Sequence, residues 1–387
     1  MSFLRRLSTR GLLLLAAAAV VVAAGGAAIA VAASRGAAKP QPKPLAQALH
    51  DALAAQPVQG ITARIRFTNS LFPSGSILGQ VGSALMSGAS GRLWATADGR
   101  GRLELQSDAG DVQVVWNGTE LSVYDASSNT VYRAQLPQHD AGKGGTTQAP
   151  PALAQIDAFL RKLGDSWAIS GARPTDVAGQ PAYSVSVSPK HDGGLLGSLR
   201  LAWDAVHGTP LRIGIYAQGS STPVLELAVT DISYGAVAPS DVDVAPPAGA
   251  KVVDLGSAPT APSGPSTPAV TGIDAVRAAA GFPVVAPDSL VGLPRKDVRL
   301  VGGGTVLAFY GQGLGGLVLV ERKADAAAGG AAGPLSSLPT VALDGLTAHE
   351  LATPLGTALE WQSGGTAYVL AGSLPPAAAE AAARAVR

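Results

Sequence analysis

The sequence predicts an α+β protein, in which a large antiparallel sheet with one apolar face precedes a smaller α+β unit. This prediction depends mainly on the alternation of apolar and polar residues between residues 61 and 229. Tyr183, Val185 and Val187, for example, alternate with serines, and successive side chains of a strand point to opposite faces of its sheet. One face is therefore apolar, and helices, a second sheet or a bound apolar ligand must cover it.

Composition narrows the classes of function. The chain has 387 residues, long enough for an N-terminal segment and two domains. Its formal net charge of +1 predicts neither a nucleic-acid partner nor an anionic surface as a partner. The absence of cysteine excludes disulfides, thiolate metal sites, a cysteine nucleophile and a lipidated N-terminal cysteine.

Residues 1–36 predict export from the cytoplasm. Arginines within the first ten residues precede an apolar stretch, residues 12–33, that is long enough to cross a bilayer. The arginines predict that the N-terminus stays inside and that the rest of the chain lies outside. The segment is either an uncleaved transmembrane anchor or a signal peptide with small-residue cleavage sites ending at Ala30 or Ala32.

The first elements after the export segment follow from spacing. Residues 37–44 form a spacer, and a helix over residues 45–53 would place Leu45, Leu49 and Leu53 on one face. The first strand begins near Ile61, and regular hairpins resume at residue 92. The strongest hairpin signal is Asn117-Gly118, because both turn positions favour residues that accept positive φ.

A second amphipathic helix and four further strands complete the sheet region. Ile156, Phe159, Leu160 and Leu163 predict the helix. The strands are predicted over residues 182–188, 198–204, 211–217 and 224–232.

Residues 71–86 interrupt this alternation with an apolar, glycine-containing stretch. Ile77, Val81 and Leu85 fall at four-residue spacing, and Leu78 lies among them. The stretch is either a plug that fills the sheet core or a mobile lid over an apolar cavity, whose motion its glycines would facilitate. The sequence leaves both interpretations open.

The domain boundaries come from proline-rich segments. The sheet region is predicted to span residues 45–253, and residues 254–270 form a Ser/Thr/Pro-rich linker. Residues 271–387 predict a small α+β domain, with a helix through Ala280, several strands, and a closing helix that starts at the prolines Pro375 and Pro376.

No motif indicates catalysis. Residues 311–316 match the dinucleotide-binding fingerprint by letter, but a strand rather than a helix follows, so a glycine-rich hairpin is the better interpretation. The histidines lie far apart without acidic partners at ligand spacing, which predicts no metal site. We therefore expect a protein that is not an enzyme and that needs no cofactor.

Several spaced segments form a pattern that continues through the sheet region. They are Gly91–Trp94, Arg102–Leu105, Trp116–Asp125, Asn129–Tyr132, Trp203-Asp204, Thr209–Arg212 and Val242–Gly249. Together they resemble the LolA-type lipoprotein-carrier superfamily of bacteria, which includes LolA, LolB and RseB-like proteins. The resemblance covers about residues 45–253. It implies a strongly curved antiparallel half-barrel, covered by helices, whose apolar interior receives acyl chains. The unit after residue 270 resembles a small C-terminal domain of unknown function in exported or anti-sigma-factor-like bacterial proteins.

The resemblance and the phase of the alternation together predict a ligand-binding set. The candidate cavity residues are Ile65, Phe67, Leu103, Val114, Trp116, Tyr183, Val185, Leu201, Trp203 and Ile213, with Ile77, Leu78, Val81 and Leu85 as the lid. The implied partner is a lipid or a lipoprotein acyl chain. The alternative implied by RseB- and MucB-type relatives is a regulatory module that binds an anti-sigma factor or another membrane protein.

Overall fold

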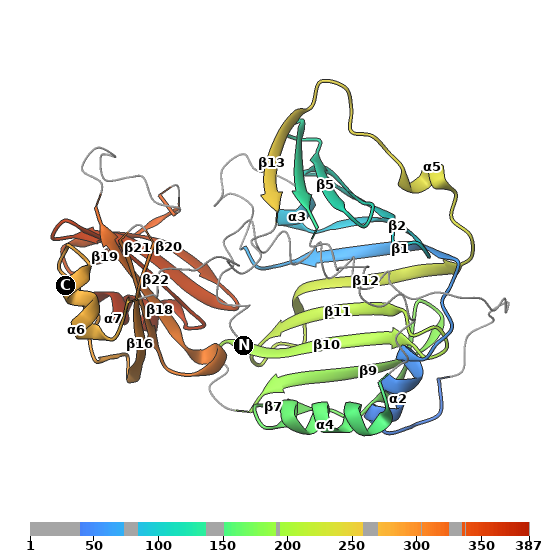
Figure 1. Ribbon diagram of the computed structural model, residues 1–387, viewed down its shortest axis with the longest axis horizontal. Helices are drawn as coiled ribbons and strands as arrows, with labels where there is room; N and C mark the ends of the chain where they lie inside the picture. Colours follow the sequence, from blue (N-terminus) through green and yellow to red (C-terminus); the bar gives the residue numbers. More distant parts are fainter. Residues whose placement is uncertain are drawn as a thin grey trace.

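A computed structural model describes residues 39–72, 84–136, 151–190, 194–257, 270–302, 304–324, 335–336 and 338–386. Within these ranges the chain is mostly β-sheet with few helices, arranged as two sheets (Figure 1). The predicted export segment and the lid residues Ile77, Leu78 and Val81 lie outside the described residues.

The first sheet contains 13 strands. These are β1 (Gly60–Asn69), β2 (Ala89–Thr96), β3 (Gly101–Ser107), β4 (Gly110–Trp116), β5 (Glu120–Asp125), β6 (Thr130–Gln135), β7 (Trp167–Ile169), β8 (Arg173–Val177), β9 (Gln180–Pro189), β10 (Leu196–Asp204), β11 (Pro210–Ala217), β12 (Pro223–Tyr234) and β13 (Lys251–Ser257). Their order is β13-β6-β5-β4-β3-β2-β1-β12-β11-β10-β9-β7, with β8 also paired to β9. The four strands predicted between residues 182 and 232 are confirmed as β9 to β12.

The end of the first sheet differs from the prediction. β13 pairs with β6 in parallel, whereas the other strand pairs of this sheet are antiparallel. The predicted linker over residues 254–270 therefore begins inside a strand. The prediction is wrong here because Lys251 pairs with Thr130, a contact between residues far apart in sequence that no local pattern reveals.

The first sheet is open and strongly curved. Figure 1 shows the strands from β13 to β2 turning away from the layer formed by β12, β11, β10 and β9. A register shift between Arg64 and Ile65 interrupts the β1–β12 pair at the place where these two halves meet. Such irregularities increase the bend of a strand.

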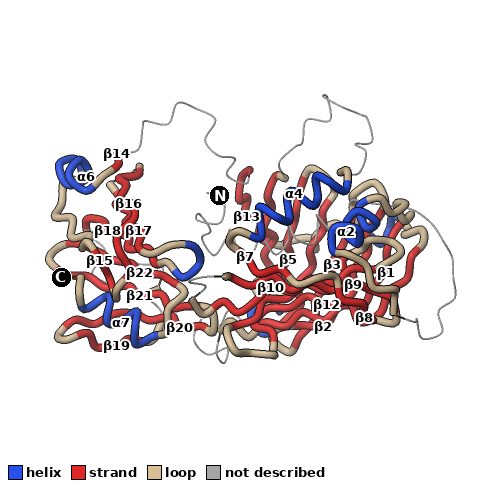
Figure 2. Tube along the Cα trace, turned by 90° about the horizontal axis from the view of Figure 1, so that it is seen from below, coloured by secondary structure: helices blue, strands red, loops and turns tan. Residues whose placement is uncertain are grey.

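Two helices lie over one face of this sheet, which we call the inner face (Figure 2). They are α2 (Leu45–Leu53) and α4 (Leu153–Gly164), and both confirm predicted helices. Their apolar faces differ from the prediction. Leu53 is 59% exposed and Phe159 is 62% exposed, because Ala48 and Ile156 take the buried positions.

Two short helices complete this part of the chain. α3 (Ala84–Ser87) contacts β1, β3 and β4, and Ala84 is fully buried among inner-face residues. α5 (Pro239–Val242) packs against β2 and β3. Helices therefore contribute less of the fold than the predicted α+β class implied.

The second sheet contains nine strands. These are β14 (Val270–Thr271), β15 (Ser289–Leu290), β16 (Leu293–Val301), β17 (Thr305–Tyr310), β18 (Leu317–Lys323), β19 (Thr340–Leu343), β20 (Leu346–Thr353), β21 (Gly356–Ser363) and β22 (Thr366–Gly372). Their order is β14-β16-β17-β18-β22-β21-β20-β19, with β15 paired to β16. The helices α6 (Ile273–Ala279) and α7 (Pro376–Arg384) confirm the helices predicted in this region.

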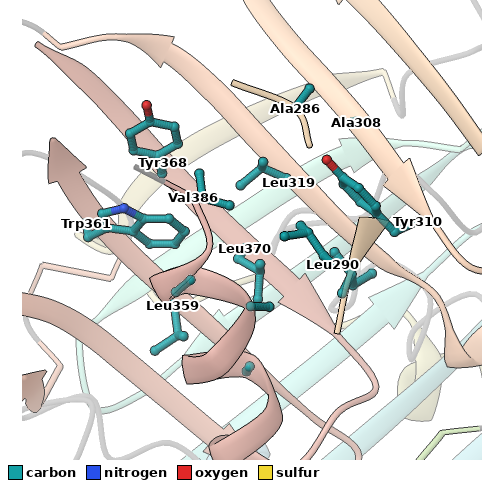
Figure 3. Packing of buried hydrophobic residues seen from close by; sticks show 14 of the residues in the cluster. Ala286, Leu290, Ala308, Tyr310, Leu319, Leu359, Trp361, Tyr368, Leu370 and Val386 are labelled. Carbon is teal, nitrogen blue, oxygen red and sulfur yellow. The ribbon is translucent and has the colours of Figure 1, made fainter. Parts of the chain in front are cut away.

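The second sheet has a hydrophobic core of its own. Trp361 and Tyr368 stack with ring centroids 5.2 Å apart, and Leu359 and Leu370 are fully buried beside them (Figure 3). The glycine-rich segment after Tyr310 forms the predicted hairpin, with a single 3-10 turn, η2 (Gly313–Gly315), before β18. A dinucleotide-binding helix is thereby excluded at this position.

The two sheets touch at a small contact. The Leu195 backbone N–H donates a hydrogen bond of 2.9 Å to the Ser373 hydroxyl, and Gly194 lies close against Ser373. A side chain at position 194 would overlap the Ser373 backbone, and Gly194 also has a positive φ of 55°.

Candidate apolar binding face

The strand register places the ten candidate cavity residues on the inner face. Leu201 lies opposite Val185 on β9 and opposite Ile213 on β11. Ile213 lies opposite Leu227, which in turn lies opposite Phe67. The remaining candidates lie on the same face. Some are two residues away from these along the same strand, and others pair directly across strands, as Leu103 does with Val114 and Trp203 with Tyr183.

One end of the inner face is covered by α2. Tyr183, Val185 and Trp203 are 2%, 8% and 3% exposed, and they pack with Ala48 of α2. The Tyr183 hydroxyl donates a hydrogen bond of 2.5 Å to the Gln41 carbonyl, which holds the segment before α2 on the sheet. These three candidates are therefore core residues beneath a helix.

The other end of the inner face is also packed. Ile65, Leu103, Val114 and Trp116 are at most 5% exposed and belong to one cluster that includes Ala84 of α3. Their inward orientation agrees with the phase of the alternation. Their role as ligand-binding residues stays a prediction.

An apolar stripe remains between these two covered ends. We call it the inner stripe, and it consists of Phe67, Leu199, Leu201, Ile213, Ile215, Leu225 and Leu227. Its residues form two rows across β10, β11, β12 and β1, a width of about 14 Å at the usual strand spacing. Leu199 is 37% exposed and Ile213 is 43% exposed, and the other five are partly buried.

The inner stripe contains Phe67, Leu201 and Ile213 from the predicted set and four residues that the prediction omitted. The omitted residues are Leu199, Ile215, Leu225 and Leu227. All four share the phase of the predicted residues, so the alternation could have found them. The difference between a covered and an uncovered position was not visible, because it depends on where α2 and α3 dock.

Of the predicted lid, only Leu85 is described. It is partly buried and packs against the core at the β1 end of the inner face. Asn69 fixes this point, since its side-chain amide donates to the Leu85 carbonyl at 2.7 Å and its side-chain oxygen accepts the Leu71 N–H at 2.9 Å. Asn69 therefore holds both Leu71 and Leu85, the described residues on either side of residues 73–83.

The buried polar groups near this face are structural. Asp204 is fully buried and accepts hydrogen bonds from the Tyr234 hydroxyl at 2.7 Å and from the backbone N–H of Val206 and His207. Burial and the adjacent carboxylate raise the pKa of Tyr234 well above its usual value, so its hydroxyl remains a donor. The His207 ring stacks on Tyr234 with centroids 3.9 Å apart. Asp204, with its acceptors occupied by these donors, closes the turn after β10.

The polar features of the described residues lie away from the inner stripe. Among the described residues, no group of three or more His, Asp or Glu side chains is placed to hold a metal ion. A polar depression of about 220 Å³, lined by Gly91, Arg92, Glu104 and Gln106, involves side chains that point to the opposite face of the sheet. The chemistry available at the inner stripe is therefore burial of apolar groups.

The part of the chain that the structure describes contains no helix with the length and apolarity needed to span a membrane. Residues 12–33 lie outside that part. The anchor therefore remains a prediction from the sequence.

Comparison with known proteins gives matches among solved structures only. No known protein family's sequence profile matches the chain, and no curated protein sequence matches it. The Pseudomonas aeruginosa MucA/MucB complex matches with 16% identity and a TM-score of 0.41, covering 87% of this chain and 95% of the matched chain. MucB in complex with MucA(peri) matches with 15% identity and a TM-score of 0.40, covering 88% and 96%.

A LolA superfamily protein from Nitrosomonas europaea also matches, with 10% identity and a TM-score of 0.23, over 52% of this chain and 98% of the matched chain. LolA and MucB are also among the proteins that the sequence segments resemble.

Proposed function

We propose that the protein binds lipid or lipoprotein acyl chains outside the cytoplasm, on the inner stripe, and that it catalyses no reaction. In this proposal residues 45–257 form the half-barrel that receives the acyl chain, and residues 271–387 form a separate unit. The export segment predicted over residues 1–36 supports the extracytoplasmic location. The observation that carries the proposal is the exposure of Leu199 and Ile213 in the middle of an otherwise covered apolar face.

The physical driving force is burial of methylene groups. Each buried methylene contributes about 0.8 kcal/mol before ordering costs, so a ~16-carbon chain would bind tightly on a stripe of seven apolar side chains. The stripe is flanked by two packed cores, which hold its strands in place. A rigid, preformed surface reduces the entropic cost of binding.

The test is lipid extraction from a pair of variants. The chain from residue 39 to residue 387 would be purified from a bacterial host, and its mass and its organic extract would be measured. We expect the parent to release a stoichiometric amount of lipid. The Ile213→Asp variant should release at least about tenfold less lipid per protein, since a carboxylate would lose its hydration beside the acyl chain. Val291→Asp is the matched control, because Val291 is 40% exposed in the second sheet. A lipid-free parent that also takes up no added phospholipid or lipopeptide would contradict the proposal.

A second candidate function is binding of a membrane protein such as an anti-sigma factor. β13 lies at the end of the strand order of the first sheet, and its Val252 is 54% exposed. An unpaired edge of this kind accepts a strand from a partner. MucB, one of the structural neighbours, is solved in complex with MucA. Val252→Asp separates the two functions, because Val252 is exposed on β13 and lies away from the inner stripe: loss of a co-purifying membrane protein with lipid binding intact favours regulation.

A further inference from the structure

The outer face of the first sheet, opposite the inner face, carries a group of arginines. The near-neutral net charge of the whole chain does not indicate this group. We call this group the outer arginine patch, and it consists of Arg64, Arg66, Arg92, Arg200 and Arg212. Each alternates with an inner-face residue, so the five side chains share the face opposite the inner stripe. All five are exposed.

The patch is contiguous across the strands. Arg64 lies directly opposite Arg92, and Arg66 and Arg212 both lie opposite Ala228 from its two sides. Arg200 lies across Gly214 from Glu226. The patch runs over β2, β1, β12, β11 and β10, a width of about 19 Å at the usual strand spacing.

Part of this positive charge is not neutralised. Arg64, Arg66 and Arg92 form no salt bridge with any described residue. The carboxylates on this part of the face are Glu226, which lies 3.9 Å from Arg212, Asp231, opposite Arg64 in the register, and Glu104, opposite Arg92. Five arginines and three carboxylates leave a local charge of +2, although the whole chain carries only +1.

We propose that the outer arginine patch docks the protein on a membrane surface of anionic phospholipids. Guanidinium groups pair well with phosphates, and each arginine near an anionic bilayer contributes to attraction. A polar depression lined by Arg92, Glu104 and Gln106 lies on the same face, beside the patch. The proposal is independent of acyl-chain binding, which uses the other face of the sheet.

A bilayer fits this patch better than an acidic protein does. Protein interfaces usually bury aromatic or large aliphatic side chains at their centre. None of the exposed large hydrophobic residues of the described chain lies among these arginines. A surface with many phosphates requires only a broad field of cations, which is the chemistry present here.

The experiment measures vesicle binding by the chain from residue 39 to residue 387. This chain contains the three hydrophobic clusters and every described element, and it lacks the predicted anchor that would itself insert into vesicles. We expect binding to vesicles that contain phosphatidylglycerol, little binding to pure phosphatidylcholine vesicles, and weaker binding at high salt. The triple variant Arg64→Gln/Arg66→Gln/Arg92→Gln should bind the phosphatidylglycerol vesicles with an affinity at least about tenfold lower.

The matched control is Lys251→Gln/Lys296→Gln/Lys323→Gln, which removes the same charge from exposed positions elsewhere. Equal losses in the two triple variants would overturn the patch as a specific surface, and so would equal binding of the parent to both kinds of vesicle. Capture of the parent by polyglutamate but not by anionic vesicles would assign the patch to an acidic protein instead. Lipid extraction from the arginine variant separates this result from acyl-chain binding, which should be unchanged.

Discussion

Trp116 and Gly101 show how single residues shape the inner face. Trp116 is fully buried, and its indole occupies the place where a side chain at position 101 would lie. The two residues face each other across the β3–β4 pair. Trp116 therefore fills the core at this end of the sheet, and the glycine opposite is what allows it to lie flat on the strand.

Gly101→Ala tests this contact. We expect the substitution to lower the free energy of unfolding by about 1–3 kcal/mol, because the added methyl group must displace the Trp116 ring. Urea denaturation would measure the change. Gly171→Ala is the control, since a methyl group there meets nothing within 4 Å, and it should leave stability unchanged or slightly higher. Equal stability of the Gly101 variant and its parent would show that the ring is not held in this position.

At the scale of elements, α4 shows what periodicity resolves and what it leaves open. The spacing of apolar residues predicts the helix but includes Phe159 in its buried side. In the structure, Ile156 is 7% exposed and Phe159 is 62% exposed, because α4 packs mainly on α2 and β7. Which part of an apolar arc becomes buried depends on the neighbouring element and not on the helix itself.

The phase of α4 can be measured with two alanine substitutions. Ile156→Ala should lower the free energy of unfolding by about 2 kcal/mol, as expected for a buried aliphatic side chain. Phe159→Ala should change it by less than about 0.5 kcal/mol, since an exposed residue loses few contacts. Both values come from the same urea denaturation series. The reverse order would mean that α4 is rotated about its axis.

The same distinction explains which parts of the candidate site were predictable. The two-residue alternation assigned Ile65, Phe67 and Ile213 to one face, and the strand register agrees. The alternation could not separate the exposed Ile213 from the buried Trp203, because only the docking of α2 covers Trp203. A charged substitution at Trp203 would consequently test folding, whereas one at Ile213 tests binding.

At the scale of the whole molecule, long-range pairing limits prediction from sequence. The parallel β13–β6 pair joins residues that a local pattern cannot relate, and it extends the first sheet past the predicted boundary. The gathering of arginines on the outer face is a similar effect, because the fold aligns strands from distant parts of the chain. Net charge describes the whole chain and misses this separation.

The two separate cores predict two unfolding transitions. The second sheet has its own cluster of buried residues, and a hydrogen bond between Leu195 and Ser373 is among the few links to the first sheet. Calorimetry of the chain from residue 39 to residue 387 should therefore resolve two transitions, as multidomain proteins commonly do. One shared transition would mean that the sheets unfold as a unit.

An acyl-chain ligand should raise the midpoint temperature of only one of these transitions, that of the first sheet. The reason is that the ligand would bind the folded first sheet and not the second. At a free ligand concentration about 100 times its dissociation constant, the stabilisation is about 2.7 kcal/mol. The Ile213→Asp variant should lose this shift while keeping both transitions, since Ile213 is too exposed to support the core. An equal rise in both midpoint temperatures would place the ligand site at the contact between the sheets. A rise in the midpoint temperature of the second sheet alone would assign ligand binding to residues 271–387.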